Sequence, residues 1–147
     1  MHENLMPEVA LRLLMQIKTI HPPPQSIWLI GSRANGRHHA MSDTDLLVFA
    51  DALFASTARS VLPAPCNIDV LVTHDGDNFS DVWQKKTGSL RSWHWVVRDA
   101  TTASYLGRKF LCDIEDENDS PQQGDSDIET GAFIERSEIA LLVWERE

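Results

Sequence analysis

The chain has 147 residues, of which 42% are hydrophobic and 24% charged, and this size and composition fit one soluble globular domain. Its net charge of −9 argues against direct nucleic-acid binding, because such binding needs Lys and Arg to neutralise phosphates. No apolar run is long enough to span a membrane, and two distant cysteines, Cys66 and Cys112, predict neither a disulfide framework nor a zinc site. We therefore expect a cytoplasmic protein without a membrane partner.

The first half of the chain alternates between helical and extended patterns. Residues 5–20 predict an amphipathic helix, and the prolines at positions 22–24 end it. Its apolar stripe consists of Val9, Leu13, Leu14, Ile17 and Ile20. Short apolar runs predict three buried strands, at residues 26–30, 46–50 and 67–73. Residues 51–60 predict a second helix, capped by Asp51, so the order of elements indicates an α/β (α+β) fold with a small mixed sheet flanked by helices.

The second half of the chain has weaker patterns. Residues 77–87 are compatible with a helix, and residues 90–99 with either a helix or a strand. Residues 113–129 hold eight carboxylates and no Lys or Arg, which is typical of a solvated segment. Residues 132–147 have the composition of a helix. The sequence thus predicts a domain over residues 1–112, an acidic linker or loop over 113–131, and a C-terminal helix or tail over 132–147.

The chemically informative stretch begins at Gly31 and Ser32, directly after the first expected strand. Glycine lets a ligand approach the backbone closely, and the free N–H groups at the start of a helical turn attract phosphate. The Ser32 hydroxyl adds a further donor. Arg33 and Arg37 flank this cradle and are candidates for phosphate contacts, although exposed loop arginines are an equally good interpretation.

Three aspartates follow, two at the entrance to the second expected strand and one inside the third. Asp43 and Asp45 are two positions apart, so in a strand they project to the same face, and Asp69 interrupts the apolar run of a neighbouring strand. Carboxylates that converge repel one another unless a cation lies between them. Because all the ligands are oxygens, Mg²⁺ is the expected ion and Mn²⁺ the alternative. Two such ions can clamp the attacking and leaving oxygens of a phosphoryl displacement.

The ordered combination resembles the minimal nucleotidyltransferase family of the DNA-polymerase-beta-like superfamily. Residues 31–36 have the form GSxAxG, residues 42–46 have the form SDxDL, and a third aspartate follows on a later strand. The resemblance covers residues 26–73 convincingly and the remainder only loosely. It implies a polymerase-beta-like nucleotidyltransferase core that transfers a nucleoside monophosphate and releases pyrophosphate.

The resemblance also implies roles for individual residues. Gly31 and Ser32 would hold the nucleoside triphosphate, and Asp43 and Asp45 would bind the metal ions. Asp69 would complete the metal site and help to activate the acceptor hydroxyl. These assignments make the three aspartates the expected catalytic and metal-binding residues.

The acceptor is indicated by the resemblance and by the length of the chain. Minimal nucleotidyltransferases commonly act with a separate helical HEPN protein as a toxin–antitoxin pair, and the chain after Asp69 leaves little room for a large acceptor platform. We therefore expect ATP, or another nucleoside triphosphate, as the donor and a hydroxyl of a HEPN-type partner as the acceptor. One alternative is an enzyme that modifies an aminoglycoside-type small molecule, which the acidic segment would attract. Another is an antitoxin without catalysis that acts by binding alone.

Overall fold

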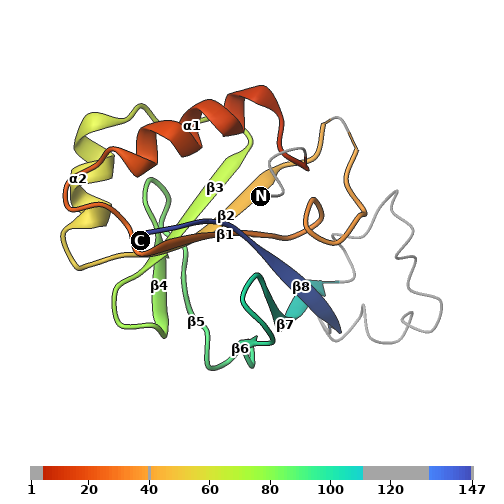
Figure 1. Ribbon diagram of the computed structural model, residues 1–147. Coiled ribbons are helices and arrows are strands. Elements are labelled where there is room, and N and C mark those ends of the chain that lie inside the picture. Colours follow the sequence, from red (N-terminus) through yellow and green to blue (C-terminus); the bar gives the residue numbers. More distant parts are fainter. Residues whose placement is uncertain (1–4, 40, 111–132, 147) are drawn as a thin grey trace.

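The computed structural model describes residues 5–39, 41–110 and 133–146, and this part forms a mixed α/β domain (Figure 1). Its elements are α1 (Glu8–Lys18), β1 (Ser26–Ile30), β2 (Thr44–Phe49), α2 (Phe54–Val61), β3 (Ile68–Thr73), β4 (Asn78–Asp81), β5 (Thr87–Ser89), β6 (Val96–Val97), β7 (Thr102–Phe110) and β8 (Phe133–Glu145). All the described strands join one curled sheet in the order β5-β4-β3-β2-β1-β8-β7-β6.

The centre of the sheet positions the expected site. β2 and β3 run parallel and are joined through α2, because a parallel pair needs a crossover connection, whereas the other neighbouring strands are antiparallel. In this register Asp45 on β2 lies opposite Asp69 on β3, and Ile30 at the end of β1 lies opposite Asp45. The crossover therefore brings together two aspartates that are far apart in the sequence.

Both described helices pack on one face of the sheet (Figure 1). Along β2, Leu46 and Val48 point into the core beneath α1 and α2, while Leu47 and Phe49 point to the opposite face. This alternation is the consequence of the two-residue repeat of a strand. The helix expected over residues 5–20 is confirmed, but it begins later, after Pro7, and Val9 is exposed, so the apolar stripe is narrower than expected.

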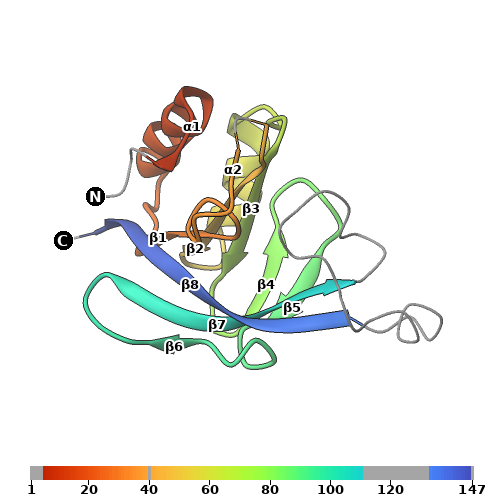
Figure 2. The same cartoon turned by 90° about the vertical axis from the view of Figure 1, so that its right-hand side faces the viewer.

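An aromatic cluster covers part of the other face. Trp93 lies between Phe79 of β4 and Tyr105 of β7, with ring centroids 4.7 Å and 5.3 Å away. Figure 2 shows β7 and β8 curving across the lower part of the molecule, with β6 below β7. The helices thus flank the sheet on one side only, and the side that carries Asp45 and Asp69 is free of described helices.

The second half of the chain differs from the expected elements in several segments. A helix over residues 77–87 is wrong, because β4 and β5 occupy this segment. Residues 90–99 are mostly turns, with β6 as their only regular element. A helix over residues 132–147 is also wrong: β8 lies between β1 and β7, where long-range pairing on both sides outweighs the helical preference of its residues. The acidic linker, 113–131, lies outside the described residues.

None of the helices in the described part of the chain has the length and apolar character needed to cross a membrane.

Candidate active site

A pocket of about 540 Å³ opens on the helix-free face of the sheet. It lies where the end of β1 and the start of β2 meet the long pair β7–β8. The side chains and backbone that line it are Ile30, Gly31, Ser32, Arg37, His39, Met41, Ser42, Asp43, Asp45, Trp93, Tyr105, Gly107, Arg136 and Glu138. Five residues that the sequence selects are therefore gathered around one cavity, namely Gly31, Ser32, Arg37, Asp43 and Asp45.

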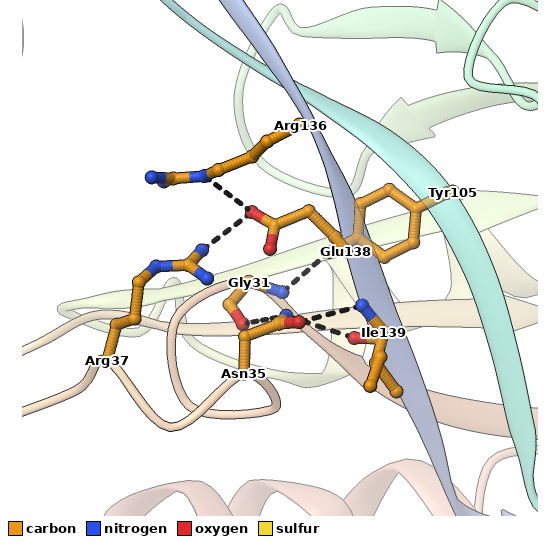
Figure 3. Close-up of polar contacts among 7 residues, drawn as sticks. All are labelled: Gly31, Asn35, Arg37, Tyr105, Arg136, Glu138 and Ile139. Atoms are coloured by element: carbon orange, nitrogen blue, oxygen red, sulfur yellow. Dashed lines mark hydrogen bonds and ion pairs between the residues drawn. The ribbon is translucent and has the colours of Figure 1, made fainter. Parts of the chain in front are cut away.

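The Gly-Ser turn at the end of β1 is a single tight turn rather than the start of a longer helix. Gly31 has a φ of 78°, a conformation that favours glycine, and its carbonyl accepts the N–H of Asn35 at 3.2 Å. The Gly31 N–H donates to the Tyr105 hydroxyl at 2.9 Å, and the Asn35 side chain exchanges two hydrogen bonds with the backbone of Ile139 (Figure 3). The turn is thus fastened to both β7 and β8.

Gly31 also lies closely against the side chain of Asp45 on β2. A Cβ atom at this position would overlap Asp45 Oδ2, so even alanine would displace the aspartate or the turn. The glycine therefore has two reasons to be here: the backbone conformation and the space that the Asp45 side chain occupies. This contact couples the phosphate cradle expected at residues 31–36 to the carboxylate on β2.

Asp45 is electrostatically strained. Burial, the adjacent Asp69, and the charge of Asp43 raise its pKa from 3.8 to about 7, while Lys86 acts in the opposite direction. Asp69 itself accepts a hydrogen bond from Gln84 Nε2 at 3.3 Å and forms an ion pair with Lys86 Nζ at 3.5 Å. A carboxylate whose pKa is raised first by burial and then by two neighbouring carboxylates is the arrangement that a bound cation would relieve.

The three aspartates share one region but do not close around a single point. Asp43 and Asp45 line the pocket, and Asp69 lies beside Asp45. Across residues 5–39, 41–110 and 133–146, no group of three or more His, Cys, Asp or Glu side chains is close enough to hold a metal ion. The oxygen-only donor set and the raised pKa of Asp45 nevertheless fit a divalent cation, which Asp43, Asp45 and Asp69 could hold.

The structure separates the two arginines. Arg37 lines the pocket and pairs with Glu138 at 2.6 Å (Figure 3). Arg33 is buried and donates to backbone carbonyls, that of Ser42 at 3.0 Å and those of Leu5 and His39 at 3.4 Å. Arg33 therefore holds the loop that leads to Asp43, and its guanidinium is not among the groups that line the pocket.

Sequence reasoning missed the wall of the pocket that β7 and β8 provide. Tyr105 supports Gly31, and Glu138 lies between Arg37 and Arg136, 3.6 Å from the Nε atom of the latter (Figure 3). A signal for this wall exists in residues 139–144, which are apolar without interruption, as expected for a strand buried on both faces. A strand there would have placed residues 136 and 138 on one face.

Against known protein families, residues 12–118 match the nucleotidyltransferase domain. The match covers well over half of the chain, and the protein therefore belongs to this family. Comparisons with curated protein sequences and with solved structures give no match. Membership supports nucleotidyl transfer from a nucleoside triphosphate, and domains of this family generally use divalent metals.

Proposed function

We propose that the protein is a metal-dependent nucleotidyltransferase that transfers AMP from ATP to a hydroxyl of a partner protein, and that the partner is the HEPN-type toxin of a toxin–antitoxin pair. The observation that carries the catalytic part is the contact between the Gly31 turn and Asp45 at the mouth of one pocket, with Asp69 adjacent. A phosphate cradle and a carboxylate pair in contact are the two parts that phosphoryl displacement needs.

Each residue has a distinct task in this proposal. Gly31 and Ser32 receive the triphosphate, and Arg37 provides a positive charge at the same pocket. Asp45 and Asp69, assisted by Asp43, would hold Mg²⁺ or Mn²⁺, which supplies positive charge to the phosphate oxygens when bound. Bringing the reacting groups into one orientation accounts for much of the acceleration that such sites achieve.

The covalent change is a displacement at the α-phosphorus. The acceptor oxygen forms a bond to this phosphorus while the bond to the oxygen bridging the α- and β-phosphates breaks, and pyrophosphate leaves with the electron pair. Asp69, which lies beside Asp45, helps to activate the acceptor hydroxyl by accepting its proton.

The position of the helices supports an acceptor on a separate molecule. Both α1 and α2 pack on the face of the sheet opposite the pocket, so in the described part of the chain no helix covers the open side of the site. The resemblance of residues 31–36 and 42–46 to minimal nucleotidyltransferases supports a HEPN-type protein as the molecule that fills this side.

The acceptor is tested by labelled transfer. The purified chain, Mg²⁺ and α-labelled ATP are incubated with a HEPN protein encoded by a neighbouring gene, and in parallel with a panel of aminoglycosides. Label on a hydroxyl side chain of the HEPN protein is the expected result. Label on an aminoglycoside would instead assign a small-molecule acceptor. If Asp43→Ala with Asp45→Ala neutralises the partner as well as the unaltered chain does, binding alone suffices and the catalytic role is rejected.

A further inference from the structure

Glu138 is a buried carboxylate in the wall of the pocket, and only one of its oxygens is engaged. The side chain is 7% exposed. Its Oε1 atom accepts a hydrogen bond from the Arg37 guanidinium at 2.6 Å and lies 3.6 Å from Arg136 Nε. Its Oε2 atom has no hydrogen-bond partner among the described residues. A buried acceptor without a partner is unfavourable, so a ligand that brings a donor to Oε2 gains more than it would from an exposed carboxylate.

The surroundings hold this carboxylate in place. Tyr105 is directly opposite Glu138 in the β7–β8 register, and Gly107 follows two positions later. A Cβ atom at Gly107 would lie 2.8 Å from Glu138 Cγ and 3.0 Å from Oε1, so the strand leaves space for the Glu138 side chain that other residues would fill. A preorganised acceptor of this kind is what discrimination between similar ligands requires.

The chemistry of the unpaired oxygen excludes the triphosphate as its partner, because phosphate oxygens are acceptors and offer no hydrogen. Tyr105, opposite Glu138, contacts the Gly31 N–H at 2.9 Å, so the carboxylate lies next to the turn that receives the phosphates. In a nucleotide the ribose follows the α-phosphate directly, and its hydroxyls are the first donors beyond the phosphates. Arg37 and Arg136 compensate the negative charge of Glu138 beside the anionic ligand.

We propose that Glu138 Oε2 accepts a hydrogen bond from the 2′- or 3′-hydroxyl of the donor nucleotide's ribose, and that the pocket thereby discriminates against nucleotides that lack this hydroxyl. This inference rests on the proposed function, since it places a nucleotide in the pocket. It does not follow from the family match, because residues 12–118 end before β8 begins.

The first test needs no variant. Calorimetric titration in Mg²⁺ without acceptor compares the affinities of the unaltered chain for ATP, 2′-deoxy-ATP and 3′-deoxy-ATP. Loss of a hydrogen bond to a charged acceptor is expected to weaken binding of at least one deoxynucleotide by roughly tenfold to a hundredfold. Equal affinity for all three overturns this inference and leaves the proposed function standing. Failure of every nucleotide to bind overturns both.

The second test assigns the preference to this residue. Glu138→Ala should bring the ratio of ATP affinity to deoxynucleotide affinity close to one, even if the release of Arg37 changes both affinities. Glu145→Ala is the matched control, since it removes an exposed carboxylate from the same strand, and it should keep the ratio of the unaltered chain. A folded Glu138→Ala protein that retains the full preference contradicts the proposal. Thermal melts establish folding, and if the variant is unfolded the deoxynucleotide ratio of the unaltered chain decides.

Discussion

The two halves of the pocket differ in how they handle charge. On β2 and β3, Asp45 and Asp69 lie side by side and repel each other, and the pKa of Asp45 rises to about 7 as a result of burial and these neighbours. On the β8 side, Glu138 is more deeply buried, with 7% of its side chain exposed against 21% for Asp69, and it is paired with Arg37 and Arg136. In the first half Lys86 lies 3.5 Å from Asp69 but leaves the pKa of Asp45 raised, so this half suits an added cation. The second half is compensated by its two arginines and suits a neutral donor such as a hydroxyl.

The largest effect on the rate of transfer is expected from removing a carboxylate on β2 or β3. Asp45→Asn should lower the rate of nucleotidyl transfer by about a thousandfold or more, because a ligand to the cation contributes several kcal/mol to stabilising the transition state. The rate is measured with labelled nucleotide at saturating Mg²⁺. Asp51→Asn is the control, since Asp51 is exposed and Asn can keep its hydrogen bond to the Leu53 N–H. Equal losses in both variants would show that the effect is not specific to the site.

The close contact between the Gly31 turn and Asp45 predicts the second largest effect on the rate of transfer. Gly31→Ala should reduce transfer by about a hundredfold, since the new Cβ overlaps Asp45 Oδ2 and displaces a catalytic group. Gly36→Ala is matched to it, because Gly36 also has a positive φ, of 73°, but has open space around a Cβ. It should destabilise the fold by about 1 kcal/mol and leave transfer within a few-fold of normal. Similar rates for the two variants would contradict the importance of the contact.

The raised pKa of Asp45 predicts a pH dependence of stability without metal. The folded state binds this proton more tightly than the unfolded chain does, so the free energy of unfolding falls as the pH rises from about 4 to about 7. Asp45→Asn removes this titrating group, so the free energy of unfolding of the variant should not fall in this pH range. The gain in the free energy of unfolding over the unaltered chain should be about 2–3 kcal/mol larger at pH 8 than at pH 5. Urea unfolding in EDTA measures the difference.

Asp75 provides the control for this titration. Hydrogen bonds from the backbone of Asp77 and from Asn78 hold the pKa of Asp75 well below its usual range. The contribution of the Asp75 carboxylate to the free energy of unfolding is therefore complete at both pH 5 and pH 8 and is lost only in stronger acid. Asp75→Asn should therefore change the free energy of unfolding by the same amount at both pH values. If the effect of Asp45→Asn is also independent of pH, the carboxylate pair is not electrostatically strained.

The arginines give the smallest predicted effects and separate positioning from binding. Arg37→Lys should raise the KM for the nucleotide by roughly tenfold or less, because lysine keeps the charge and loses the planar fork. Arg33→Lys should lower the free energy of unfolding by about 1–2 kcal/mol, because Arg33 donates to the carbonyls of His39 and Ser42 from a buried position. Its KM should change by no more than about twofold. If Arg33→Lys raised the KM and Arg37→Lys lowered only the free energy of unfolding, the roles given to the two arginines would be refuted.

The two halves were also unequally predictable from the sequence. The first half follows from local pattern: an apolar run, a glycine turn and aspartates two positions apart specify where Gly31 and Asp45 lie. The alignment of Asp69 with Asp45 follows from the parallel crossover that this order of elements favours. The assignments of Asp43, Asp45 and Asp69 as metal ligands stay predictions.

The second half depends on contacts between distant parts of the chain. The residues of β8 include Glu, Arg, Ala and Leu, which favour helices, beside the apolar run 139–144, and pairing with β1 and β7 decides in favour of a strand. Without that strand, Glu138 and Tyr105 have no reason to be near Gly31. Arg33 illustrates the same limit, since its position in the sequence suggests a phosphate contact, while its burial under the loop depends on tertiary packing.

The central claim, transfer of a nucleotidyl group from this pocket, is tested most directly with ATP labelled at two positions. Parallel reactions in Mg²⁺ contain ATP labelled on the α- or on the γ-phosphate, with the unaltered chain or with Asp45→Asn. We predict that α-label becomes covalently attached to the acceptor and γ-label is released as pyrophosphate, only with the unaltered chain and only until EDTA is added. Transfer of γ-label, or no Mg²⁺-dependent transfer from any of the four nucleoside triphosphates to partner, self or small molecule, would contradict this account.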